Sequence, residues 1–164
     1  MNILIIGATR GIGKALLECA LDEQHRITVV ARNPDRINKQ HPNLQIIGGD
    51  IRDLNSLETA AVGMDAVCSC IGVPITFSQV DLFSTAAANL VSVVTSNPGQ
   101  KLVCITGIGA GDSKGHGGFL YDKLFKPLLL KTIYADKDKE EEIIKKSSVD
   151  WMIVRPAGLT NGPR

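Results

Sequence analysis

The sequence lacks the features that mark membrane-spanning, nucleic-acid-binding and secreted proteins. Among its 164 residues, no apolar run reaches the roughly 18 residues of a membrane-spanning helix. A net charge of +1 and the lack of a basic stripe give no indication of a nucleic-acid partner. No basic region precedes the apolar run at the N-terminus, and Gly7 interrupts that run, so we expect a core strand there rather than a signal peptide.

Metal-ligand spacings are also missing. The three histidines are scattered in turn-like contexts, and no cysteine pair has a C-x-x-C spacing, so we expect no metal site. The cysteines all lie in apolar segments. We interpret them as small buried residues of a cytoplasmic protein, kept reduced by the cytosol: Cys19, Cys68, Cys70 and Cys104.

The composition is that of an ordinary globular protein, with 44% apolar and 21% charged residues. A chain of 164 residues is long enough for one domain with a substantial core. No repeat and no linker divides the sequence. We therefore expect residues 1–164 to form a single domain.

Apolar segments alternate with segments of helical periodicity. Strands are predicted at residues 3–6, 27–31, 44–47, 65–70, 102–106 and 151–154. Helices are predicted at residues 12–22, 54–62 with Asp53 as the cap, 80–96, and over most of 119–147 with a break at Pro127. Most strands are continuous apolar runs, which is typical of a parallel sheet covered on both faces. Right-handed crossovers then predict an α/β fold, a Rossmann-type doubly wound parallel sheet with strand order 3-2-1-4-5-6 and helices on both faces.

The first predicted strand runs directly into a glycine-rich turn and then into a helix. Such a junction offers unpaired backbone N–H groups and the positive end of the helix dipole, which suit the pyrophosphate of a dinucleotide. We assign Gly7 to a sharp exit from the strand, Gly11 to the close approach of phosphate, and Gly13 to close packing of the helix on the sheet. The predicted binding residues of this turn are Gly7, Thr9, Arg10, Gly11, Ile12 and Gly13. The alternative is merely a tight connection between strand and helix.

The residues after the second predicted strand favour a phosphorylated dinucleotide. NAD-selective folds place an acidic residue at the end of this strand, where it binds the ribose 2′-hydroxyl. Here the strand is followed by Arg32, so a guanidinium stands in place of a carboxylate. Arg32 suits a 2′-phosphate, with Arg10 reaching it from the glycine-rich turn and Arg36 as a third candidate. The sequence therefore predicts NADP(H), the alternative being that these arginines are only solvated.

The glycine spacing, G-x-x-x-G-x-G rather than G-x-G-x-x-G, resembles that of the short-chain dehydrogenase/reductase superfamily. The resemblance implies that Asp50 contacts the adenine amino group and that Ile51 packs on the ring. It also implies a turn under the nicotinamide ribose after the fourth strand, made of Cys70, Ile71 and Gly72. A plain surface turn is the alternative in both places.

The end of the chain narrows the resemblance. Residues 147–160 read SSVDWMIVRPAGLT, which resembles the SGLDWTIVRPGGLT segment of atypical short-chain dehydrogenases with an NAD(P)H-binding, NmrA-like domain. That group includes flavin reductase/biliverdin-IXβ reductase-like proteins. Residues 105–113, ITGIGAGDS, are similar to the loop that follows a strand in the same group. The resemblance covers nearly the whole chain and implies a nicotinamide end flanked by Gly72 and Pro156.

The catalytic pair of the superfamily is only partly present. Its main branch uses Tyr-x-x-x-Lys, in which the tyrosine donates a proton to the substrate carbonyl and the lysine holds the ribose. Here Tyr134 and Lys137 are three positions apart, and alignment on the terminal segment places Ile133 at the tyrosine position. Ile144 shares a helix face with Lys137, so we expect Lys137 to point inward. The alternatives are a solvated lysine within the charged run 136–142 and a Tyr134 that is not the proton donor.

Two further departures concern the substrate side. The serine expected after the fifth strand is missing, and the nearest hydroxyl is that of Thr106. We expect Thr106 to bind the cofactor and a substrate or flavin, the alternative being that it simply ends the strand. Related proteins usually continue for a few dozen residues beyond the point where this chain ends. We therefore expect either a truncated chain or an unusually open substrate side.

Two functional hypotheses follow. The first is an NADPH-dependent reductase that transfers hydride to a flavin, a quinone-like compound or another conjugated small molecule, since such acceptors need little acid catalysis. The glycine-rich segment 107–118 would cover the substrate. The second is a non-catalytic NADP(H)-binding redox sensor of the NmrA type. A sugar epimerase or dehydratase of the extended branch is a weaker third hypothesis, because the chain leaves little room for a substrate domain. We expect a monomer or a homodimer.

Overall fold

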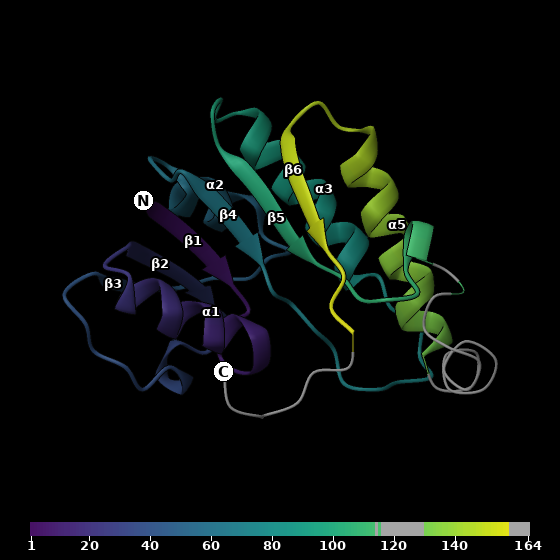
Figure 1. The fold of residues 1–164 in the computed structure, drawn as a ribbon, viewed down its shortest axis with the longest axis horizontal. Coiled ribbons are helices and arrows are strands. Elements are labelled where there is room, and N and C mark those ends of the chain that lie inside the picture. The colour runs from purple at the N-terminus through teal and green to yellow at the C-terminus, as the bar shows by residue number, and fades with distance from the viewer. Residues whose placement is uncertain (114, 116–129, 158–164) are drawn as a thin grey trace.

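The computed structural model describes residues 1–113, 115 and 130–157. Within them, parallel strands form one six-stranded sheet in the order β3-β2-β1-β4-β5-β6, which confirms the predicted α/β class and strand order (Figure 1). The strands are β1 (Asn2–Ile6), β2 (Arg26–Ala31), β3 (Leu44–Gly48), β4 (Ala66–Ser69), β5 (Lys101–Ile105) and β6 (Asp150–Val154).

Helices connect the strands. In the described part of the chain they are α1 (Gly11–Asp22), α2 (Leu54–Ala61), α3 (Leu82–Thr95) and α5 (Lys131–Lys146), with 3-10 turns η1 (Pro34–Arg36) and η2 (Gly111–Ser113). The predicted cap of α2 is confirmed, because the Asp53 carboxylate accepts a hydrogen bond from the N–H of Asn55 at 3.2 Å. The helix predicted over 119–147 is confirmed from Lys131 onward. Its earlier part, including the break at Pro127, lies outside the described residues.

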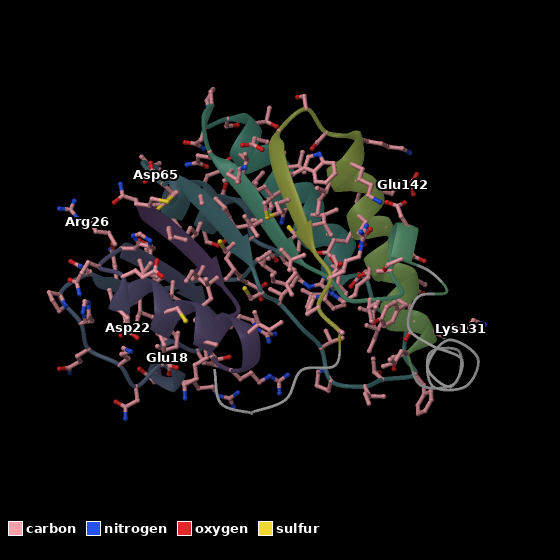
Figure 2. The ribbon with its side chains drawn as sticks, in the orientation of Figure 1. Glu18, Asp22, Arg26, Asp65, Lys131 and Glu142 are labelled. Atoms are coloured by element: carbon pink, nitrogen blue, oxygen red, sulfur yellow. The ribbon has the colours of Figure 1, made fainter. Side chains whose placement is uncertain are left out.

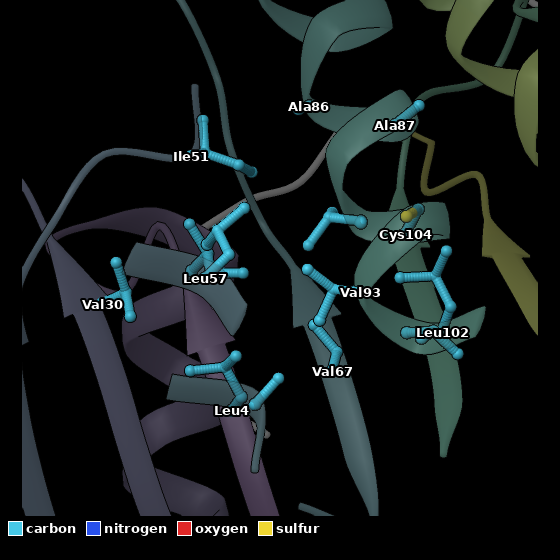
Figure 3. Packing of buried hydrophobic residues seen from close by; sticks show 14 of the residues in the cluster. Leu4, Val30, Ile51, Leu57, Val67, Ala86, Ala87, Val93, Leu102 and Cys104 are labelled. Carbon is cyan, nitrogen blue, oxygen red and sulfur yellow. The ribbon is translucent and has the colours of Figure 1, made fainter. Parts of the chain in front are cut away.

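Two apolar clusters hold the layers together, one on each face of the sheet. Successive strand residues point to opposite faces, so β1 contributes Leu4 to one cluster and Ile5 to the other. Leu4 belongs to the cluster that includes Leu57 of α2 and Val93 of α3 (Figure 3). Ile5 belongs to the cluster that includes Leu17 of α1. Helices therefore cover both faces, and full burial of each such side chain contributes about 1.5–3 kcal/mol.

The carboxyl ends of the central strands meet at one edge of the sheet, where ligands bind in open α/β folds. Backbone hydrogen bonds extend the strand pairing past the last strand residues. The N–H of Cys70 donates to the carbonyl of Ile6 at 2.8 Å, and the N–H of Gly49 donates to that of Ala31 at 3.1 Å. The loops after β3 and β4 therefore begin from fixed positions next to β2 and β1.

Many charged side chains lie around the outside of the molecule. Figure 2 shows this for Glu18, Asp22, Arg26, Asp65, Lys131 and Glu142. None of the described helices combines the length and the apolar character that crossing a bilayer requires.

A buried acid fixes α5 against the start of α3. Asp81, the residue before α3, makes no side-chain cap. Instead the carboxylate of Asp136 on α5 accepts hydrogen bonds from the N–H of Phe83 at 2.8 Å, the N–H of Ser84 at 3.3 Å and the Ser84 hydroxyl at 2.5 Å. Asp136 is only 1% exposed. Its negative charge therefore satisfies orphan donors at the positive end of the α3 dipole.

We expect Asp136→Ala to lower the free energy of unfolding by about 3 kcal/mol, because it leaves buried N–H groups without an acceptor. Urea denaturation followed by circular dichroism measures the change. Glu142→Ala, on an exposed part of the same helix, is the matched control and should change stability by less than about 0.5 kcal/mol. An Asp136→Ala protein as stable as this control would contradict the assignment.

Candidate functional site

A cavity of about 630 Å³ lies at the carboxyl ends of the strands. Its walls come from the β1–α1 turn, the segments after β2, β3, β4 and β5, and side chains of α3 and α5. Among the predicted site residues, those that line it are Gly7, Thr9, Arg10, Gly11, Ile12, Arg32, Asp50, Ile51, Cys70, Ile71, Gly72, Thr106 and Lys137. Gly13, Tyr134 and Pro156 are not among its lining residues. The fold thus brings together most of the residues that the sequence analysis selected.

The glycine-rich turn is a backbone cradle that side chains would fill. Gly7 has φ +91°, and a Cβ there would lie 2.6 Å from the carbonyl oxygen of Cys70. A Cβ on Gly13 would lie 2.2 Å from the carbonyl oxygen of Gly7, so α1 packs directly on the turn. Gly11, at φ +58°, borders open space, because a Cβ there would meet no other atom within 4 Å.

The start of α1 is left open to a ligand. Arg10 precedes the helix in an extended conformation and provides no side-chain cap, and no acidic residue lies in the first turn. The first N–H groups of a helix have no partner within the helix, so those of α1 remain available to an anion beside the cavity.

Arginines surround the end of the cavity next to β2. Arg10, Arg32 and Arg36 all line it and are exposed, and within the described residues no ion pair ties them to an acid. Gly49 also lines this end, and a Cβ there would lie 3.0 Å from Val30 and 3.1 Å from the Ser56 hydroxyl. Gly49 was not among the predicted site residues, although its place between a strand and Asp50 could have indicated it.

The loop after β3 is held rigidly. Asp50 accepts a hydrogen bond from the N–H of Arg52 at 2.9 Å, and the Arg52 guanidinium pairs with Asp81 at 2.6 Å. Ile51 is buried, and its carbonyl accepts a hydrogen bond from the Asn89 side chain of α3 at 2.9 Å. Asp50 and Ile51 are thus presented to the cavity from a fixed turn.

Lys137 reaches the cavity from α5, as predicted for an inward-pointing side chain. Its ammonium lies 3.5 Å from the carbonyl of Ile105, 3.8 Å from the carboxylate of Glu140 and 4.0 Å from the centroid of the Phe83 ring. Burial lowers the pKa of Lys137, and the nearby carboxylate of Glu140 opposes that shift. None of these contacts is a short hydrogen bond, so the ammonium at the cavity wall keeps donors for a ligand.

Ile133 contacts the cavity, whereas the neighbouring Tyr134 is directed toward the loop after β5. Ile133 lines the cavity. Tyr134 is buried, and its hydroxyl donates a hydrogen bond to the carbonyl of Ile108 at 3.0 Å. The side chain that faces the cavity one turn before Lys137 is therefore an isoleucine, in agreement with the sequence alignment. The proton-donor role of Tyr134 stays a prediction.

Thr106 belongs to a buried polar network. Its hydroxyl donates to the Glu141 carboxylate at 2.9 Å, and the Arg155 guanidinium donates to the same carboxylate at 2.8 Å and 2.5 Å. Burial alone would raise the pKa of Glu141, but the hydrogen bonds from Arg155 and Thr106 outweigh it, so this pKa is lowered. Because its proton is directed to Glu141, Thr106 can act toward a ligand only as an acceptor.

Several charged residues of the run 136–142 are buried, although the sequence left open that this run is solvated. Asp136, Lys137, Glu140 and Glu141 are all buried on α5. The signal was present in the spacing, because Lys137 and Glu140 fall on the same helix face as Ile133 and Ile144. Among the cysteines, Cys68 and Cys104 are buried as predicted. The prediction was wrong for Cys19 on α1 and for Cys70, which lines the cavity, because both are partly exposed.

Arg155→Met removes the principal donor to a buried carboxylate. Because the pKa of Glu141 is lowered by folding, its charge stabilises the fold at pH values above the ordinary pKa of 4.5. This contribution is lost as the pH falls through the pKa of the folded protein. We expect the variant to lose about 2 kcal/mol at pH 7, less than the about 3–5 kcal/mol typical of a broken buried pair. Lys145, 3.4 Å from Glu141, remains to compensate part of the charge.

Denaturant unfolding of wild type and Arg155→Met across pH 4 to 8 measures this difference. The gap between the two proteins should shrink toward pH 4. Without Arg155, burial raises the pKa of Glu141, so the variant removes its poorly compensated charge by protonation while Glu141 of the wild type is still ionised. A gap that stays constant over this range would contradict the ion-pair account.

Known proteins resemble this chain in sequence or in structure. An uncharacterized chloroplastic protein of Arabidopsis thaliana is 29% identical over 176 residues, covering 99% of this chain and 60% of the relative. ChuY, an anaerobilin reductase from Escherichia coli O157:H7, has a similar structure with TM-score 0.79 and 24% identity, covering 99% of this chain and 75% of that one. A short-chain dehydrogenase/reductase from Veillonella parvula in complex with NADP has TM-score 0.79 and 18% identity, covering 99% and 71%.

The chain spans about 60% of the length of the Arabidopsis relative. The similar structures share the fold, with identities below 25%. The model of the NAD(P)H-binding family matches residues 7–164, which include the glycine-rich turn and nearly all of the lining of the cavity. The chain therefore belongs to the NAD(P)H-binding family.

Proposed function

We propose that this protein is an NADPH-dependent reductase that transfers hydride to a flavin, a quinone-like compound or another conjugated small acceptor. The observation that carries the proposal is the composition of the cavity wall. A dinucleotide cradle and a buried lysine are present, while the position that faces the cavity one turn before Lys137 is Ile133. When bound, the nicotinamide would supply the hydride.

The residues present fit such a dinucleotide. The diphosphate would rest on the N–H groups at the start of α1, where Gly7 and Gly13 leave no room for side chains. Asp50 and Ile51 would receive the adenine, and Lys137 would hold the ribose next to the nicotinamide.

The choice of NADPH over NADH rests on the arginines. No acidic residue directly follows β2, and Arg10 and Arg32 line the cavity where the adenine ribose would lie. A guanidinium forms strong paired hydrogen bonds with a phosphate, whereas it gives little advantage to a 2′-hydroxyl.

Among the described residues, the two hydroxyls predicted to serve the reaction direct their protons to other groups, which favours acceptors with delocalised electrons. The Tyr134 hydroxyl donates to Ile108, and the Thr106 proton is directed to Glu141. A simple ketone needs a proton on its oxygen as hydride arrives, whereas a conjugated acceptor spreads the charge and can take its proton from solvent. The similarity to ChuY, an anaerobilin reductase, supports a conjugated acceptor here.

Arg32→Asp tests the cofactor assignment. We expect the Kd for NADPH to rise at least about tenfold, because a charge-assisted contact with the 2′-phosphate is replaced by repulsion. The Kd for NADH should change less than about threefold, since NADH lacks that phosphate. Titration of nicotinamide fluorescence measures both constants. Arg26→Asp, at the opposite end of β2, makes the same charge change away from the cavity. Equal effects of the two variants on NADPH would refute the assignment.

The acceptor is tested by following the nicotinamide absorbance after mixing protein, NADPH and either FMN or a quinone. We expect oxidation of NADPH, a rate within about twofold of wild type for Tyr134→Phe, and a loss of at least about tenfold in kcat/KM for Lys137→Met. A large loss for Tyr134→Phe would instead assign the proton donor to Tyr134 and favour carbonyl substrates.

The second candidate function is a non-catalytic NADP(H)-binding redox sensor of the NmrA type. It is favoured by the turn of Tyr134 toward Ile108, which leaves the catalytic pair of the superfamily incomplete. Tight binding of NADPH without oxidation by any acceptor would support the sensor over the reductase. The NmrA-like subgroup and the cytoplasmic location stay predictions from the sequence.

A further inference from the structure

Glu140 is a buried acid that the proposed chemistry does not yet use. It lies on α5, is 1% exposed, and its Oε2 atom has no hydrogen-bond partner within the described residues. The neighbouring buried acids are fully engaged, since Asp136 caps α3 and Glu141 binds Thr106 and Arg155. Glu140 therefore differs from them in having an unsatisfied carboxylate oxygen.

That unsatisfied oxygen lies beside the cation that lines the cavity. The Oε2 atom of Glu140 is 3.8 Å from the Nζ atom of Lys137, beyond hydrogen-bond distance but close enough for strong electrostatic interaction. The remaining contacts of the ammonium, with the carbonyl of Ile105 and the ring of Phe83, carry no full negative charge. In the described part of the chain, Glu140 is thus the acid in direct contact with Lys137, while Glu141 and Asp136 act on its charge from farther away.

We propose that Glu140 is a positioning residue that acts through Lys137 and couples the binding of an anionic dinucleotide in the cavity to the uptake of one proton. The inference rests on the proposed function, because it requires the dinucleotide to bind beside Lys137. When Glu140 is ionised, its negative charge compensates the positive charge of Lys137. With Glu140 protonated, the full charge of Lys137 is available to the ligand.

The electrostatic surroundings put this exchange in the neutral range. Burial raises the pKa of Glu140 to about 7, against the opposing effect of Lys137, while Glu141 and Asp136 on the same helix raise it further. From β5, the Cys104 thiol faces Glu140, and burial keeps that thiol protonated by raising its pKa. Arg155, which follows β6, is bound to Glu141.

The sign of the coupling follows from the charges. An anionic ligand beside Lys137 makes it less favourable to ionise Glu140, so binding raises the pKa of Glu140 and takes up a proton. By linkage, the ligand binds more tightly as the pH falls through the pKa of the empty protein. The affinity for NADPH should therefore increase from pH 8.5 to pH 6.

The test compares the Kd for NADPH in wild type and Glu140→Gln from pH 6 to pH 8.5. Glutamine keeps the shape of the side chain and removes its titration. We expect the ratio of the wild-type Kd to the variant Kd to be near one at pH 6 and about five at pH 8.5. The 2′-phosphate itself titrates near pH 6, but it does so with both proteins and cancels in the ratio. Glu142→Gln, at an exposed site on α5, is the matched control and should follow the wild type.

A second measurement needs no ligand and no variant at Glu140. Carbon-13 NMR of the glutamate carboxyl groups in the wild-type protein should show Glu140 titrating near pH 7, and this midpoint should rise in Lys137→Met because the cation is lost. A midpoint near the ordinary glutamate value would overturn the inference even if Glu140→Gln failed to fold.

The outcomes separate the inference from the proposed function. Binding of NADPH with a Kd ratio that does not vary with pH would refute the role of Glu140 and leave the reductase proposal intact. Absence of NADPH binding by the wild type at every pH would refute both. A pH-dependent ratio with the expected sign would support a positioning role, since a merely structural side chain would shift affinity equally at all pH values.

Discussion

The site depends on a close approach of backbone to backbone at the end of β1. Only glycine fits at Gly13, where α1 lies against the carbonyl of Gly7, and at Gly7, where the turn lies against Cys70 after β4. These contacts fix α1 so that its open N-terminus points at the edge where the strands end (Figure 1). A bulkier side chain at either position would have to displace the helix or the strand, and the anion cradle would be lost with it.

Sequence reasoning predicted the sheet and the cradle because both depend on local patterns. Continuous apolar strands indicate a parallel sheet, and a parallel sheet requires that the segments after each strand meet at one edge. Residues as far apart as Arg10, Asp50 and Thr106 could therefore be assigned to one cavity from their places after the strands. The roles given to Gly7 and Gly13 match the contacts that a Cβ would make there.

The burial of the charged residues of α5 could not be predicted in the same way, because charged side chains are usually exposed to solvent. A run rich in Asp, Lys and Glu reads as a solvated face, and its burial depends on partners that are distant in the sequence. Asp136 is satisfied by backbone groups of α3, and Glu141 is satisfied by Thr106 and Arg155. Nothing local to the run reveals these partners. The direction of Tyr134, toward Ile108 rather than the cavity, is likewise set by tertiary packing.

The buried acids of α5 explain how one helix can both hold the fold and serve the site. Burying a carboxylate is costly unless hydrogen bonds or a cation compensate it, so each acid specifies its neighbours. Asp136 specifies the start of α3, and Glu141 specifies the ends of β5 and β6. With the helix fixed by these two, Lys137 lines the cavity, and Glu140 lies 3.8 Å from it without a hydrogen bond. Because one Glu140 oxygen has no hydrogen-bond partner, this pair can respond to a ligand, which is the property a binding site requires.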